Sequence, residues 1–227
     1  AELEKEELCG FIFKSKSPSS GMERVKVYTE KGFPGSNKGI GLFARAFMAR
    51  FPLIPVEEEG RLHDAALREN FIERIFALKR WRQVAEEKKR RGAIVAFHTE
   101  HKLQIMSHSQ QHYRDMGRLI ARVKETPQES LYEQYEAMLM QALSLRATVK
   151  KNVNVLQHMA GYFKQQLSKD EKQELQEIIE QYHQNYTPLI VPITLVNHYV
   201  RKYGQEYLKK QYYLNPHPIE LKLRNRA

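Results

Sequence analysis

The feature that most constrains the fold is the spacing of apolar residues, which recur three or four positions apart over most of the chain after residue 61. Two such runs lie in segment 93–124, one with Ile94, Phe97, Leu103 and Met106 and the other with Tyr113, Met116, Leu119, Ile120 and Val123. Apolar positions at this period form one face of an amphipathic helix. Ser109 separates the two runs and is a favourable N-cap residue. The segment therefore predicts two helices joined by a tight polar turn at residues 107–109.

Helix start signals extend this pattern in both directions along the chain. They are Asp64, Pro127, Thr148, Ser168 and Pro188, each followed by apolar residues at helical spacing. Gly204 ends the last and most apolar of these helices. The sequence therefore predicts a mainly α protein: a helical bundle of about six or seven helices from Arg61 onward, preceded by a partial α/β module. We place the domain boundary between residues 1–62 and 63–227.

The first 60 residues follow a different pattern. Residues 2–8 have the composition of a helix end, and residues 9–13 form a short apolar run that is typical of a buried strand. Residues 14–21 are rich in serine and lysine and contain one proline and one glycine, which predicts a surface turn directly after that strand. Residues 31–38, rich in glycine, proline and asparagine, predict a mobile loop.

Two further N-terminal motifs allow more than one interpretation. Gly39 and Gly41 precede a predicted short helix at residues 42–48, and a Gly-x-Gly turn in that position can hold a phosphate, although the full dinucleotide pattern is absent. Three adjacent carboxylates at residues 57–59 suit acid–base chemistry or a metal, or simply form a solvated turn.

The positive charge of the chain is confined to two segments. The formal net charge is +10, yet residues 1–60 and residues 92–200 each carry equal numbers of basic and acidic side chains. Residues 61–91 hold 10 basic and 5 acidic side chains, and residues 201–227 hold 7 and 2. Such a distribution is the electrostatic footprint of a nucleic-acid binder. Solubility alone, or loose binding to any polyanion, is the alternative.

The candidate nucleic-acid-binding residues lie in and just after the first of these segments. We expect them to be Lys79, Arg80, Arg82, Lys88, Lys89, Arg90, Arg91, His98, His101, Lys102, His112 and Tyr113. Lysine and arginine neutralise phosphates, and histidine and tyrosine offer hydrogen bonds and stacking faces. Trp81 could stack on a base, but a lone tryptophan is more often a core residue. Tyrosines interleaved with the C-terminal basic residues allow the same two interpretations.

Four of the nine histidines fall between residues 98 and 112, which raises the question of a metal. His98 and His101 share a helix face, and His108 and His112 flank the predicted turn. Zinc needs three or four convergent ligands, and no cysteine or suitably placed carboxylate completes the set, so we expect no tight zinc site. The remaining interpretations are hydrogen bonds that lock the helix pair and a surface that binds a ligand.

The polar residues around these histidines resemble those of a bacterial helical family, the domain of unknown function 1722. The strings are Ala-Phe-His-x-x-His-Lys at residues 96–102, Met-x-His-Ser-x-x-His-Tyr-Arg at residues 106–114, and Gly-Arg at residues 117–118. Residues 14–28 likewise resemble the active-site loop of thiouracil-desulfurase-like domains (domain of unknown function 523) and the segment that follows it when the helical domain is fused behind. The resemblance covers most of the chain.

This resemblance implies kinship with desulfidases that remove sulfur from thiolated uracil, including 4-thiouridine in transfer RNA. In that family a [4Fe–4S] cluster is held by three cysteines, one of which falls on Ser20, while Ser17 matches an active-site hydroxyl. Because serine is a poor substitute for a thiolate, we expect no cluster in this chain. We therefore interpret it as a fragment or an inactive form of a longer enzyme, with the helical domain as the part that binds transfer RNA or another structured RNA. The alternative is a non-catalytic module that binds RNA or a protein partner.

Two remaining features bear on the environment of the chain. Prolines interrupt its most apolar stretch, around residues 189–196, and residues 2–7 are acidic, so we expect neither a membrane span nor a secretory leader. Cys9 is the single cysteine, which excludes an intrachain disulfide and fits a reducing cytoplasm.

Overall fold

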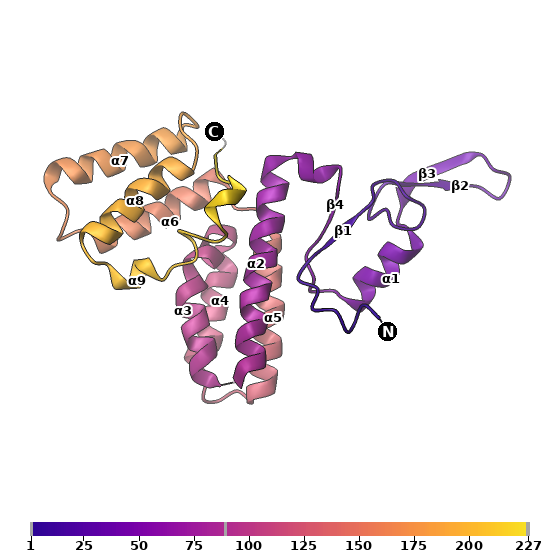
Figure 1. Ribbon diagram of the computed structural model, residues 1–227, viewed down its shortest axis with the longest axis horizontal. Coiled ribbons are helices and arrows are strands. Elements are labelled where there is room, and N and C mark those ends of the chain that lie inside the picture. Colours follow the sequence, from indigo (N-terminus) through magenta and orange to yellow (C-terminus); the bar gives the residue numbers. More distant parts are fainter. Residues whose placement is uncertain (1, 89, 226–227) are drawn as a thin grey trace. The chain divides into compact units, whose positions relative to one another are not determined.

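The computed structural model describes residues 2–88 and 90–225, which form two compact units, Ala1–Lys79 and Arg80–Ala227. Helix α2 (Ala65–Lys88) begins in the first unit and ends in the second (Figure 1). Asp64 caps this helix, because its carboxylate accepts hydrogen bonds from the backbone N–H groups of Ala66 and Leu67. The boundary predicted between residues 62 and 63 lies just before α2 and stays a prediction.

The N-terminal unit combines two small sheets with one short helix. Strand β1 (Phe11–Phe13) pairs in parallel with β4 (Val56–Glu58), and β2 (Val25–Tyr28) forms an antiparallel hairpin with β3 (Pro34–Gly39). Helix α1 (Leu42–Arg50) follows the hairpin, and a 3-10 turn, η1 (Arg61–His63), precedes α2. The core of this unit is formed by Phe13, Ala44, Phe47 and Ile54, with Phe11 packed against it.

Two local predictions for this unit are wrong. Residues 2–8 form irregular turns rather than a helix, because Leu3 and Leu8 both pack onto the small core and hold the segment in place. The expected mobile loop at residues 31–38 instead contributes β3. Gly32, with a φ of 77°, lies in the turn of the hairpin, and Gly39 admits the close approach of Val25 and Val27, so the glycines build a hairpin here.

The second unit is entirely helical within its described residues, which confirms the predicted mainly α fold. After α2 come α3 (Arg91–His108), α4 (Gln110–Ala121), α5 (Gln128–Ser144), α6 (Val149–Tyr162), α7 (Lys169–His183), α8 (Ile190–Lys202), the short α9 (Glu206–Lys209) and the 3-10 turn η2 (Ile219–Leu221). Helices α3, α4 and α5 lie side by side, and α6, α7 and α8 form a second group that packs on α3 (Figure 1). The predicted N-caps Ser109, Thr148 and Ser168 are confirmed.

The core of the helical unit has a smaller part around Trp81 and a larger part that also contains aromatic side chains. Trp81 is 1% exposed and stacks on Tyr135 at 4.8 Å between ring centroids, with Phe97 at its edge. Trp81 is therefore a core residue. The larger part joins α3 to α6, α7 and α8 and to the C-terminal segment through Leu103, Met106 and their neighbours. None of the described helices is long and apolar enough to span a membrane.

Candidate functional site

The serine-rich loop at residues 14–21 is held by hydrogen bonds of its own. The Ser17 hydroxyl accepts hydrogen bonds from the backbone N–H groups of Ser19 and Ser20, at 3.3 and 3.1 Å, and the Ser17 carbonyl accepts one from Gly21 at 2.8 Å. Ser17, the predicted active-site hydroxyl, thus shapes the loop and keeps its own hydrogen free to donate. Ser20 is half-buried beside it.

This loop lies across the first turn of α1. The Ser19 carbonyl accepts hydrogen bonds from the N–H groups of Phe43 and Ala44, and the Pro18 carbonyl accepts one from Leu42. A Cβ atom on Gly41 would lie 2.2 Å from the Ser19 oxygen, so the glycine is what admits this contact. Because loop carbonyls occupy the helix N–H groups, the Gly-x-Gly turn does not offer them to a phosphate, and that interpretation of the sequence was wrong.

Two of the three adjacent carboxylates, Glu58 and Glu59, support the same loop from its other side. Glu58 accepts hydrogen bonds from the N–H groups of Met22 and Glu23, at 2.8 and 3.3 Å, and Glu59 accepts one from Ser15 at 2.7 Å. Glu57 is bonded to Arg61 at 2.6 Å and is 8% exposed. The expected solvated turn is therefore buried at Glu57 and Glu58 and exposed at Glu59, and Glu58 and Glu59 hold the two ends of the serine-rich loop.

The residues present do not fit the iron–sulfur cluster that the family resemblance implies. Such clusters are held by thiolates, and this chain has one cysteine. Cys9 lies before β1 rather than within a strand, and its thiol donates to the Glu7 carbonyl at 3.6 Å. Among the described residues no group of three or more histidine, cysteine or acidic side chains converges in a way that could hold a metal.

The four central histidines each bond to a different partner. His98 pairs with the Tyr135 hydroxyl at 3.1 Å, and His108 donates from Nδ1 to the Leu145 carbonyl at 2.6 Å. His112 Nδ1 lies 2.9 Å from the Ser109 hydroxyl. These bonds link α3 to α5 and to the segment after it, and they close the turn before α4. They agree with the interpretation in which the histidines lock the helices together.

His101 lies deepest and has the most constrained ring. Its Nδ1 donates to the Phe97 carbonyl at 2.8 Å, and its Nε2 accepts from Arg80 Nε at 3.0 Å, which fixes one neutral tautomer. Burial, reinforced by the charge of Arg80, lowers the pKa of His101 to about 3. Burial, with a smaller effect from Lys102, lowers the pKa of His98 to about 4. Both rings are buried, so we leave them out of the proposed binding surface.

The structure distributes the predicted basic residues over several environments. Lys79, Arg90 and Arg91 are exposed, and Arg91 donates to the Thr126 carbonyl at 3.2 Å. Arg80 and Arg82 are half-buried. The predictions for Lys89 and for the side chain of Lys88 fall outside the described parts of the structure.

Helix α3 and the turn after it carry the other predicted residues. Lys102 lies over the Tyr207 ring at 4.9 Å, and Tyr113 packs against the larger part of the helical core. His112 is half-buried in the first turn of α4. Lys102 therefore reaches the C-terminal segment, whereas Tyr113 keeps only part of its ring accessible.

The tertiary structure brings the two positively charged segments together. Arg80, near the end of α2, donates from its terminal nitrogen to the Pro216 carbonyl at 2.9 Å, although the two residues are 136 positions apart. Its guanidinium also lies 4.0 Å from the ring centroid of Tyr212. Lys209 and Lys210 are exposed just before that tyrosine. Arg80 and the basic C-terminal segment, with Lys209 and Lys210, thus form one basic region of the helical unit, whereas Arg91 lies at Thr126.

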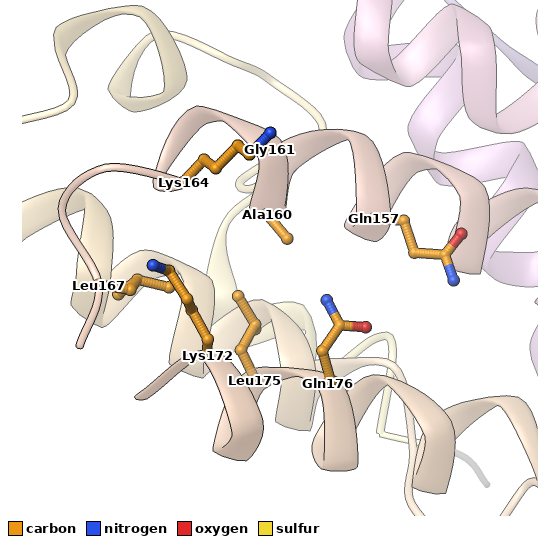
Figure 2. Close-up of a pocket in the computed structure, with 8 residues that line it drawn as sticks. All are labelled: Gln157, Ala160, Gly161, Lys164, Leu167, Lys172, Leu175 and Gln176. Atoms are coloured by element: carbon orange, nitrogen blue, oxygen red, sulfur yellow. The ribbon is translucent and has the colours of Figure 1, made fainter. Parts of the chain in front are cut away.

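A separate hollow of about 310 Å³ lies between α6 and α7. Its lining residues are Gln157, Ala160, Gly161, Lys164, Leu167, Lys172, Leu175 and Gln176. Figure 2 shows the two glutamines at one end of the hollow and the lysines toward the other, with apolar side chains between them. The hollow could not be predicted from the sequence, because its residues come from two segments and only their packing brings them together.

The chain has two parts: a small α/β module with a serine-rich loop, followed in the sequence by a helical unit with a basic region. Each part matches a different family. Residues 102–218 match the family model described as "Protein of unknown function (DUF1722)", and residues 1–59 match the model described as "2-thiouracil desulfurase". The "Uncharacterized protein YbgA" of Escherichia coli (strain K12) is 32% identical over 153 residues, which cover 67% of this chain and 90% of YbgA. No solved structure matches the chain. The chain therefore belongs to the DUF1722 family and carries a 2-thiouracil desulfurase-like segment in front of it.

Proposed function

We propose that the helical unit binds structured RNA, transfer RNA in particular, for a desulfurase-like module that acts on thiolated uridine. The observation that carries the proposal is the contact of Arg80 with Tyr212 and Pro216, which joins the two segments that hold the whole excess of positive charge. A single basic region of this kind neutralises neighbouring phosphates of one nucleic acid. The desulfurase-like match of residues 1–59 supports the substrate class.

The N-terminal loop has the form that a substrate-facing loop needs. Its backbone is fixed from two sides, by α1 and by the carboxylates of Glu58 and Glu59, while the Ser17 hydroxyl keeps a hydrogen to donate. A thiolated base offers a sulfur that can accept such a hydrogen bond. The single cysteine of this chain does not provide a cluster ligand set, so the proposed role of the loop is to bind and orient the base.

The RNA proposal predicts a steep dependence of affinity on salt. Each phosphate that is neutralised contributes roughly 0.7 to 0.9 log units of affinity per log unit of salt. We expect the Lys209→Gln/Lys210→Gln double variant to bind transfer RNA more weakly and to flatten this slope by about 1.5, because two exposed cations of the joined basic region are lost. The measurement is a fluorescence anisotropy titration with transfer RNA at several salt concentrations.

A matched control removes the same charge from elsewhere on the helical unit. Lys124 and Lys150 are exposed and lie in the segment whose charges balance, so Lys124→Gln/Lys150→Gln should keep the parent's slope. If the parent does not bind transfer RNA at low salt, or if both double variants lose the same affinity, the proposal is wrong. The helical unit would then be better explained as a module for a protein partner.

A further inference from the structure

Arg80 and His101 both pack on the ring of Tyr212. Arg80 Cζ lies 4.0 Å from the ring centroid, and the His101 ring is stacked at 4.3 Å with an angle of 27° between the planes. Arg80 Nε and His101 Nε2 are themselves 3.0 Å apart. Groups on opposite faces of the tyrosine would be roughly 8 Å apart, too far for that hydrogen bond. Arg80 and His101 therefore share one face, and the described residues place no other aromatic ring or cation on the opposite face.

Tyr212 also lines a cavity of about 240 Å³, which lies between α3 and the segment after α9. The lining residues are Glu100, Lys209, Lys210, Gln211, Tyr212 and Asn215. The volume is below the roughly 300–1,000 Å³ of sites for drug-sized ligands, and it suits a single planar group with a small substituent.

The walls of this cavity are rigid. The N–H of Tyr212 donates to the Glu100 carbonyl at 3.0 Å, and Gln211 Nε2 donates to the Thr99 carbonyl at 2.7 Å, so the segment is bonded twice to α3. His101 is held between Phe97, at 3.7 Å, and Tyr212. A ligand that stacks on Tyr212 therefore meets a surface that is already in position, which lowers the entropic cost of binding.

The polar groups of the cavity divide into cations and acceptors. Lys209 and Lys210 are exposed cations that reach a phosphate. Gln211 is 2% exposed, and its Oε1 has no hydrogen-bond partner among the described residues. A buried acceptor without a partner is costly, and a ligand that donates a hydrogen bond relieves that cost. Glu100 also lines the cavity, and its carboxylate can serve as a second acceptor.

We propose that this cavity binds one unstacked base of RNA, stacked on the face of Tyr212 opposite Arg80 and His101, with its phosphate at Lys209 and Lys210. The acceptors Gln211 and Glu100 select bases that carry an amino group, cytosine, adenine or guanine, over uracil. This inference rests on the proposed RNA-binding function and adds a base site to it. Single-stranded or looped RNA supplies such bases, since a paired base is not free to enter.

The direct test places 2-aminopurine, a fluorescent base with an amino group, at the centre of a short RNA oligonucleotide. We expect its fluorescence to change on binding to the parent and to Tyr212→Phe, which keeps the stacking ring. Tyr212→Leu should abolish that change and weaken binding roughly 5- to 150-fold, because it removes one base-stacking platform. Tyr186→Leu is the control, since Tyr186 is 77% exposed and does not line the cavity.

Selectivity is measured separately, with oligocytidylate and oligouridylate of equal length and with cytidine monophosphate by saturation-transfer NMR. We expect the parent to prefer cytidylate and Glu100→Ala to lose part of that preference with an unchanged salt slope. If the parent binds RNA but Tyr212→Leu binds equally well with the same fluorescence change, the base site is wrong and the proposed function stands. If the parent binds cytidine monophosphate but no transfer RNA, the base site stands and the proposed function fails. If it binds neither, both are wrong.

Discussion

Acidification should destabilise the helical unit through two buried histidines. The pKa of His98 is lowered to about 4 and that of His101 to about 3, whereas an unfolded chain titrates near 6.5. Between these pKa values the unfolded state binds protons that the folded state does not bind. The contribution of the two histidines to the stability of the folded state is therefore complete above about pH 6.5 and is lost as the pH falls toward 4 and 3.

The size of this effect follows from proton linkage. At pH 5 the unfolded form of each histidine is almost fully protonated and the folded form is almost fully neutral, so each costs roughly 2 kcal/mol relative to pH 7.5. Together the two residues should remove about 4 kcal/mol of the free energy of unfolding.

Urea unfolding at several pH values measures this directly, and Trp81 is a suitable probe. It is the single tryptophan of the chain and is buried in the helical unit, so its fluorescence reports that unit alone. His101→Asn keeps an N–H group near the Phe97 carbonyl but does not titrate. We expect this variant to be less stable at pH 7.5 and to lose about 2 kcal/mol less than the parent on acidification. Equal pH dependence in parent, His101→Asn and His98→Asn would refute the reasoning.

Further predictions concern two glycine positions and a helix cap. Gly41→Ala should destabilise the N-terminal unit by about 1–3 kcal/mol and speed amide exchange at Phe43, because its Cβ would collide with the Ser19 carbonyl. A Cβ atom at Gly117, within α4, meets open space, so Gly117→Ala should stabilise the helical unit by about 0.5–1 kcal/mol. If Gly41→Ala and Gly117→Ala shift the exchange rates and the thermal midpoint in the same direction, this reasoning is wrong. Ser168→Ala should cost about 1 kcal/mol in thermal unfolding, because it removes the capping box of α7, and an unchanged midpoint would show that the cap contributes nothing.

Much of the helical architecture was predictable from sequence because its signals are local. The caps Ser109, Thr148 and Ser168 act within one turn of their own helices, and apolar spacing marks the face that each helix buries. The hairpin at β2 and β3 was missed for the complementary reason. Its glycines have the composition of a loop, and only the partner strand shows that they admit close approach.

The candidate sites were only partly predictable. Charge counting located the two basic segments, and the motif Lys-Ser-x-Ser-Pro identified the loop at residues 14–21. The support of that loop by Glu58 and Glu59 was not predictable. The sequence around a glutamate does not show whether its carboxylate faces solvent or accepts a hydrogen bond from a distant backbone N–H group. Nothing in the sequence indicates that Arg80 packs against the ring of Tyr212. Nor does the sequence indicate that Tyr212, rather than Arg80, lines the cavity.

The sequence by itself determined where the helices begin and end, which faces they bury and where the positive charge lies, because these depend on residues within a few positions of one another. The tertiary structure alone decided that His98 and His101 are buried and that Arg80 meets Tyr212 and Pro216. Those contacts join segments far apart in the chain and depend on how the helices pack. Desolvation and the direction of a ring face are properties of that packing, which places Arg80 against the C-terminal basic segment and beside its cavity.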